Sequence, residues 1–86
     1  MFGKKILVID DTVLMQKIIA DILRSENYNV LVAGSGEEGL LKVAQEKPDL
    51  VILDISLPGI DGFEVCKILR DNESNNLMPI IMITSH

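Results

Sequence analysis

Residues 48–64 read PDLVILDISLPGIDGFE, and this stretch decides the fold. Pro48 ends the amphipathic segment before it. The four apolar residues 50–53 do not alternate with polar ones, which is typical of a strand buried on both faces of a parallel sheet. The apolar run stops at Asp54, a loop containing Pro and Gly follows, and Asp61 has the position of a helix N-cap. The stretch therefore predicts a buried strand, a loop and a helix, with a carboxylate where the strand ends.

The same alternation of strand and helix patterns extends in both directions along the chain. Apolar residues recur every three or four positions in the helical segments and form short runs in the strands. The predicted strands are 4–10, 30–33, 50–54 and 79–84, the predicted helices are 12–25, 35–47 and 61–71, and a polar turn covers 72–77. Helical connections of this length predict a doubly wound α/β fold with a parallel sheet, and ligands then bind at the carboxyl ends of the strands. Because no linker or repeat is present, residues 1–86 are interpreted as one domain.

Composition excludes several classes of function. Eight Lys and Arg stand against 13 Asp and Glu, a net charge of −5, so binding to nucleic acid or to an anionic membrane surface is not expected. Apolar runs such as residues 6–9 are far shorter than the ~18 residues needed to cross a bilayer, which favours a cytoplasmic location. Cys66 is the single cysteine, so there is no internal disulfide and no cysteine zinc site.

Polar residues stand at the ends of three of the predicted strands. Asp10 and Asp11 follow the first strand, Asp54 ends the third and Thr84 ends the fourth. Parallel strands bring these ends to one edge, where three nearby carboxylates raise one another's pKa unless a cation binds. All-oxygen ligands favour a hard cation such as Mg²⁺. A single aspartate at such a position is usually a cap or loop residue, but the combination indicates a site for transferring a phosphoryl group to an aspartate.

Three stretches together resemble the receiver domain of two-component response regulators. They are residues 6–11 (ILVIDD), 48–64 (PDLVILDISLPGIDGFE) and 79–85 (PIIMITS), and the resemblance covers essentially the whole chain. It implies a flavodoxin-like sheet with strand order 2-1-3-4.

The resemblance also implies roles for individual residues. Asp54 is the expected phosphoacceptor. Asp11 and Asp54 would bind Mg²⁺ through their side chains, Asp10 through a coordinated water, and Ser56 through its backbone carbonyl. Thr84 would donate a hydrogen bond to the phosphoryl group. The implied phosphoryl donor is a histidine kinase or a phosphotransfer protein, and the chain itself is not expected to be an enzyme.

The family pattern continues beyond the fourth strand with a helix, a fifth strand ending in lysine, and a final helix. Residues 1–86 contain none of these, and no lysine follows Lys67. We therefore expect a truncated receiver with impaired phosphorylation, which forms a homo-oligomer or pairs with a complementing chain through the apolar edge of its fourth strand. The alternative is a structural or assembly fragment that is not phosphorylated.

Two other interpretations fit the chain less well. Residues 34–39 (GSGEEG) match a dinucleotide-binding pattern, but Glu37 and Glu38 would place two negative charges beside the pyrophosphate, and a capping box from Ser35 to Glu38 explains the same residues. A haloacid-dehalogenase-type phosphatase needs a second aspartate two positions after its nucleophile as general acid. Ser56 stands there instead.

Overall fold

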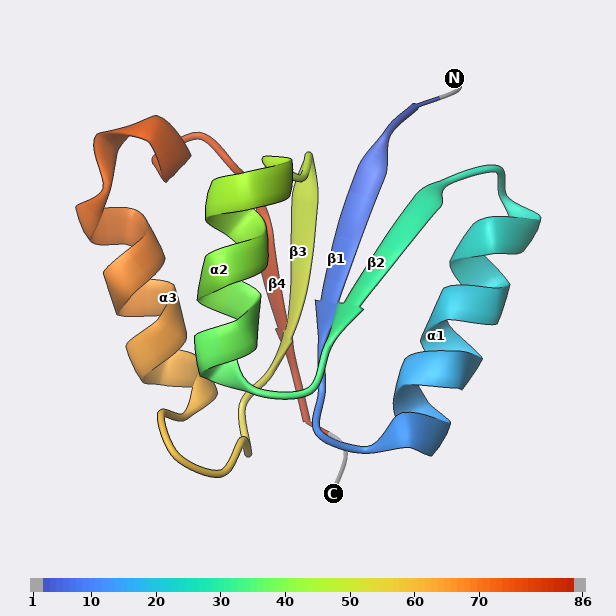
Figure 1. The fold of residues 1–86 in the computed structure, drawn as a ribbon, viewed down its shortest axis with the longest axis horizontal. Coiled ribbons are helices and arrows are strands. Elements are labelled where there is room, and N and C mark those ends of the chain that lie inside the picture. Colours follow the sequence, from blue (N-terminus) through green and yellow to red (C-terminus); the bar gives the residue numbers. More distant parts are fainter. Residues whose placement is uncertain (1–2, 85–86) are drawn as a thin grey trace.

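Residues 3–84 are described by the computed structural model, which contains four strands, three α-helices and one short 3₁₀ turn. The predicted bounds differ from the observed ones only at end and cap residues, and the 3₁₀ turn lies in the segment predicted as a polar turn. The elements are β1 Lys5–Ile9, α1 Val13–Ser25, β2 Asn29–Ala33, α2 Gly36–Glu46, β3 Leu50–Asp54, α3 Gly62–Asp71, η1 Glu73–Asn75 and β4 Ile80–Ile83 (Figure 1).

The sheet has the order β2-β1-β3-β4, and each of its three strand pairs is parallel. This confirms the predicted doubly wound topology. β1 and β3 occupy the centre, and in the register between them Ile9 lies opposite Leu53. Both central strands are paired on both sides, so the segments that end in the predicted site are the most constrained part of the sheet.

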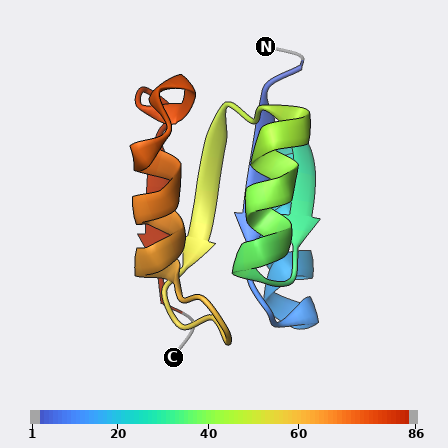
Figure 2. The ribbon, with the colours of Figure 1, turned by 60° about the vertical axis from the view of Figure 1, so that its left-hand side comes forward.

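The helices cover the two faces of the sheet unequally. Helices α2 and α3 lie on one face and α1 lies on the other (Figures 1 and 2). The main apolar cluster lies between the sheet and the pair α2 and α3; it comprises Leu7, Ile9, Ala33, Val43, Val51, Leu53, Leu57, Val65 and Leu69. Cys66 of α3 is half-buried against this cluster. None of the helices within residues 3–84 is long and apolar enough to span a bilayer.

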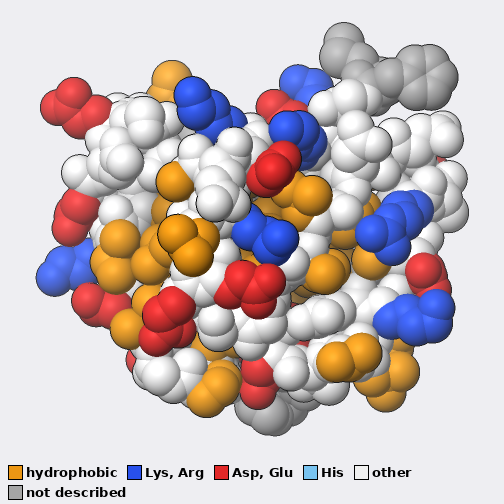
Figure 3. Space-filling view, in the orientation of Figure 1, with side chains coloured by type: hydrophobic (Ala, Val, Ile, Leu, Met, Phe, Trp, Pro, Cys, Tyr) orange, Lys and Arg blue, Asp and Glu red, His pale blue; other side chains and the backbone are white. Residues whose placement is uncertain are grey.

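The outer surface of α2 and α3 carries charged side chains of both signs with apolar side chains between them (Figure 3). Leu41, Phe63 and Ile68 are among the exposed apolar residues of these two helices. On the face shown, no extended positive patch of the kind that attracts a phosphate backbone is visible.

The helix caps follow the sequence with one correction. Ser35 Oγ accepts from the Glu38 backbone N–H at 3.1 Å, and Asp61 Oδ1 accepts from the Glu64 backbone N–H at 2.9 Å, as predicted. The Glu38 carboxylate, however, accepts from the Gly34 backbone N–H at 2.8 Å, whereas the capping-box pattern predicts a bond to Ser35. This N–H belongs to the glycine segment that suggested dinucleotide binding, and it is already used by a negatively charged side chain.

Strand β4 pairs with β3 and lies at an edge of the sheet within residues 3–84. Ile81 is 50% exposed there, and the other three residues of the strand are half-buried. On the face covered by α1, Leu14, Ile18 and Ile22 of that helix are also exposed. The part of the chain that the structure describes therefore leaves apolar surface uncovered around β4 and α1.

Gly62 allows α3 to begin directly against the end of β3. A Cβ atom at this position would overlap the Asp54 carbonyl oxygen and would lie 2.8 Å from the Ile55 Cα, both backbone atoms. The Gly62 backbone N–H also donates to the Ile55 carbonyl at 3.0 Å. The absence of a side chain at residue 62 thus fixes how closely α3 approaches the backbone of Asp54.

Replacing Gly62 with alanine is expected to destabilise the fold by about 1–3 kcal/mol, because backbone atoms cannot rotate away from the added methyl group. Gly34→Ala is the matched control, since a Cβ at residue 34 would lie at an ordinary 3.7 Å from side-chain atoms. Urea denaturation of the two variants measures the difference. Equal stability of Gly62→Ala and the parent chain would contradict this description of the β3–α3 junction.

Candidate metal centre

The strand register places Asp10 and Asp54 side by side. Because Ile9 lies opposite Leu53 in adjacent parallel strands, the next residue of each strand comes to the same level of the sheet. The Asp10 backbone N–H donates to the Ala33 carbonyl of β2 at 3.0 Å, so its main chain is still part of the sheet. Asp11 follows in the loop that leads to α1.

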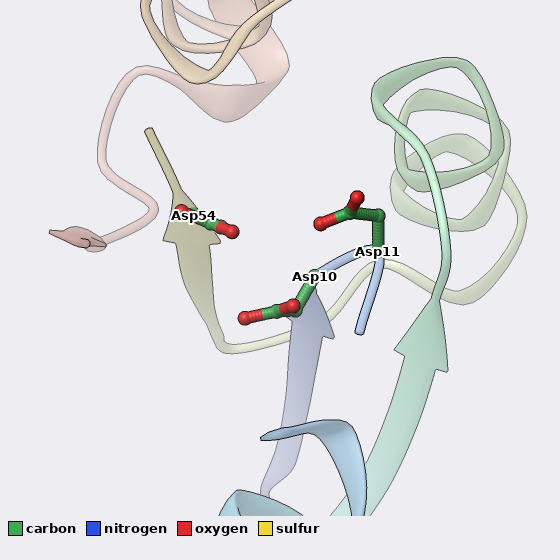
Figure 4. Close-up of side chains that lie close together, drawn as sticks. All are labelled: Asp10, Asp11 and Asp54. Carbon is green, nitrogen blue, oxygen red and sulfur yellow. The ribbon is translucent and has the colours of Figure 1, made fainter. Parts of the chain in front are cut away.

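The three carboxylates converge on one small volume. One oxygen from each of Asp10, Asp11 and Asp54 lies within 4.8 Å of the others. Figure 4 shows their carboxylates pointing into the space between the ends of β1 and β3. Asp10 and Asp54 are fully buried, and Asp11 is exposed. The cluster thus has a closed inner side, formed by the two strand ends, and an open side at Asp11.

Local turns hold the two buried carboxylates. Asp10 Oδ1 accepts from the Thr12 backbone N–H at 2.8 Å, and Asp54 Oδ1 accepts from the Ser56 backbone N–H at 3.0 Å. In both cases an aspartate binds the N–H two residues later, a turn that aspartate side chains favour. The second oxygen of Asp10, Oδ2, is buried and has no hydrogen-bond partner among the described residues.

Burial raises the pKa of Asp10 above its ordinary value of 3.8, and the carboxylates of Asp54 and Asp11 raise it further. The hydrogen bond from the Thr12 backbone acts in the opposite direction. The folded chain therefore holds the Asp10 proton more tightly than the unfolded chain does. Protonated Asp10 therefore adds to the stability of the fold at a pH below its pKa in the unfolded chain. This stabilisation is lost as the pH rises from that value through the raised pKa of the folded chain.

The donor set fits a hard divalent cation. Three carboxylates at this separation supply oxygen ligands only, and the unpartnered Asp10 Oδ2 is a buried acceptor that a cation or its bound water would satisfy. Mg²⁺ retains several waters when it is bound by few carboxylates, so the open side at Asp11 suits it. The arrangement combines a cation site with a strand-end carboxylate, which are the parts needed to accept a phosphoryl group.

The other two predicted site residues lie near this edge. The Ile55 backbone N–H donates to the Ile83 carbonyl at 2.8 Å, so Thr84, which directly follows β4, lies close to the backbone after Asp54. Thr84 and Ser56 are both exposed. Ser56 binds the Asp54 carboxylate through its backbone N–H.

One residue of this region was missed by the sequence analysis. The Gln16 side chain of α1 donates from Nε2 to the Asp10 carbonyl at 2.6 Å. The only signal in the sequence was an amide side chain on the helix face that also carries Ala20 and Leu23.

The fold and the acidic cluster define a class of protein: a doubly wound α/β domain with three clustered carboxylates at the carboxyl ends of its two central strands. Residues 6–86 match the family model of the response regulator receiver domain. The chain therefore belongs to the response regulator receiver family.

Individual relatives agree with this assignment. The chain is 45% identical over 83 residues to the alkaline phosphatase synthesis transcriptional regulatory protein PhoP of Bacillus subtilis; the match covers 96% of this chain and 34% of PhoP. This chain thus spans about a third of the length of that relative.

Two solved structures show the same fold. The N-terminal domain of a response regulator receiver protein from Methanoculleus marisnigri has a TM-score of 0.91 and 32% identity, with 95% of this chain and 67% of that one covered. The response regulator TrrA of Thermotoga maritima, solved in complex with Mg²⁺–BeF, has a TM-score of 0.88 and 38% identity over 98% of this chain and 71% of that one.

Asp10→Asn is expected to stabilise the metal-free chain at neutral pH, because it removes a buried negative charge beside two others. A gain of about 1 kcal/mol, or roughly 4–8 °C in Tm, is the expected scale. Thermal unfolding in the presence of a chelator measures it, with Asp21→Asn on the exposed surface of α1 as the control. A lower Tm for Asp10→Asn than for the parent chain would contradict this account of the cluster.

Proposed function

We propose that this chain is a cytoplasmic phosphoacceptor module that receives a phosphoryl group on Asp54 from a phosphohistidine of a histidine kinase or phosphotransfer protein. The observation that carries the proposal is the convergence of Asp10, Asp11 and Asp54 at the carboxyl ends of β1 and β3. The family assignment supports it. The chain then acts in signal transduction and is not a turnover enzyme.

In the proposed reaction a carboxylate oxygen of Asp54 attacks phosphorus. A P–O bond forms, the P–N bond to the donor imidazole breaks, and the imidazole leaves with the electron pair of that bond and takes up a proton. Mg²⁺ held by the side chains of Asp11 and Asp54, by Asp10 through a water and by the Ser56 carbonyl would neutralise charge on the phosphoryl oxygens. The Thr84 hydroxyl donates a hydrogen bond to one of them. The TrrA structure with Mg²⁺–BeF supports the choice of cation.

Asp54 is buried, with an exposed fraction of 0%, whereas Asp11 is exposed, so a phosphoryl group would approach from the open side of the cluster at Asp11. Residues 58–59 of the loop between β3 and α3 are exposed. Gly59 has φ +72°, a conformation that glycine adopts without strain, and its surroundings include the Glu37 carboxylate.

Incubation with Mg²⁺ and acetyl phosphate is expected to add the mass of one phosphoryl group, detected by intact-mass spectrometry. Asp54→Asn should abolish the addition, and Asp11→Ala should lower its rate at least tenfold, because a cation ligand is lost. Asp21→Asn is the matched control and should label like the parent chain, since Asp21 is exposed and forms its ion pair with Lys17. Unchanged labelling in Asp54→Asn would remove Asp54 from the proposed role.

A complete lack of labelling in the parent chain would favour the second proposed function, an assembly module. The uncovered apolar surface around β4 favours self-association of the 86-residue chain. An edge strand presents unpaired backbone groups, and Ile81 adds an apolar side chain that is 50% exposed. A second copy that pairs with β4 would extend the sheet and cover this side chain. Self-association by itself is compatible with phosphorylation, because the edge of β4 and the acidic cluster involve different groups; the two functions differ in whether Asp54 is phosphorylated.

Ile81→Lys is expected to shift the chain toward monomer, since a charge on an edge strand opposes pairing. Leu41→Lys is the matched control; Leu41 is 62% exposed and lies on α2. Light scattering coupled to size-exclusion chromatography over a range of concentrations measures the mass. A parent chain that stays monomeric at high concentration would contradict the self-association proposal.

A further inference from the structure

The Gln16 side chain connects α1 to the ends of two strands. Its Nε2 donates to the Asp10 carbonyl at 2.6 Å and approaches the Ala33 carbonyl at 3.5 Å. Asp10 follows β1, and Ala33 is the last residue of β2. Because both neighbouring groups are acceptors, the amide nitrogen and not its oxygen must face them, which fixes the orientation of the side chain.

The contact replaces a missing bond of the sheet. At the start of the β1–β2 ladder the Asn29 backbone N–H donates to the Lys4 carbonyl. If the ladder continued in the same register, the Ser35 backbone N–H would donate to the Asp10 carbonyl. However, β2 ends at Ala33, and Ser35 is already the N-cap of α2. The Gln16 amide instead satisfies this carbonyl.

The Asp10 carbonyl belongs to the peptide that links Asp10 to Asp11. The orientation of a peptide plane sets the direction of the chain on either side of it. At Asp10 the N–H is held by Ala33 and the carbonyl by Gln16, so both backbone groups are fixed before the chain reaches Asp11. Asp11 is exposed, and no other part of the sheet ladder holds the chain at that point within the described residues.

We infer that Gln16 is a positioning residue of the acidic site: its amide orients the Asp10–Asp11 peptide so that both carboxylates reach one divalent cation. This inference rests on the proposed function, in which the cluster binds Mg²⁺. Gln16 contacts neither the cation nor the phosphoryl group. It acts by reducing the number of conformations available to Asp11 before binding, which lowers the entropic cost of assembling the ligands.

The test is a titration of the full 86-residue chain with MgCl₂, followed by the backbone amide NMR signals of residues 11, 12, 55 and 56. Gln16→Met keeps the length of the side chain but removes the donor, and it should weaken Mg²⁺ binding by about three- to tenfold, the range expected for one hydrogen bond. Gln16→Ala leaves room for water at the two carbonyls, and it gives the second measurement if the methionine variant does not fold. Its expected loss of affinity is at least twofold.

Two variants of α1 separate positioning from general loss of stability. Lys17→Met has the same new side chain at the next, exposed position. Ile19→Val removes a methylene from the half-buried side of the helix and should cost about 0.5–1.5 kcal/mol of stability. Both should bind Mg²⁺ with the parent affinity at temperatures where they are folded.

Parent-like affinity in both Gln16 variants would overturn the inference, and so would an equal loss of affinity in Ile19→Val. In either case the parent chain still binds Mg²⁺, and the proposed function stands. If the parent chain does not respond to Mg²⁺ at all, the proposed cation site is contradicted and the positioning role of Gln16 is lost with it.

Discussion

The fold brings three negatively charged carboxylates close enough to repel one another. Parallel pairing of β1 with β3 brings Asp10 beside Asp54, and Asp11 completes a set of carboxylate oxygens within 4.8 Å. Two of these side chains are fully buried, where water cannot screen their charges. Nothing in the register allows the strands to separate the charges without losing the central pairing of the sheet. A divalent cation is the simplest partner that converts this unfavourable cluster into a stable one.

The rest of the chain supports the cluster from several sides. The two central strands pair with neighbours on both sides and most of their residues are buried, so their carboxyl ends have little freedom. Short turns then direct Asp10 and Asp54 by bonds from the N–H groups of Thr12 and Ser56. Gly62 lets α3 begin within contact of the Asp54 backbone. The site is therefore held in place at its buried side, whereas Asp11 at its open side is exposed.

The sequence predicted those features that follow from local pattern and topology. Apolar runs located the strands, helical periodicity located the helices, and the meeting of parallel strand ends at one edge predicted that Asp10, Asp11 and Asp54 lie together. Features that depend on tertiary contacts were not accessible in this way. Glu38 accepts from Gly34 and not from Ser35. The Gln16 side chain bonds to the Asp10 carbonyl because β2 ends at Ala33 and supplies no backbone N–H for that carbonyl. Ser56 and Thr84 were placed near the site, yet their roles toward a phosphoryl group stay predictions.

Thermal unfolding of the parent chain, measured with a chelator and with excess MgCl₂, tests directly whether the acidic cluster binds a divalent cation. A cation that binds the folded cluster and not the unfolded chain raises stability by about 2.7 kcal/mol at a hundredfold excess over its Kd. If the acidic cluster binds Mg²⁺, Tm rises with Mg²⁺ concentration, and the rise is strongly reduced in Asp11→Ala. An identical Tm in chelator and in MgCl₂ would show that the carboxylates at the ends of β1 and β3 do not form a divalent cation site.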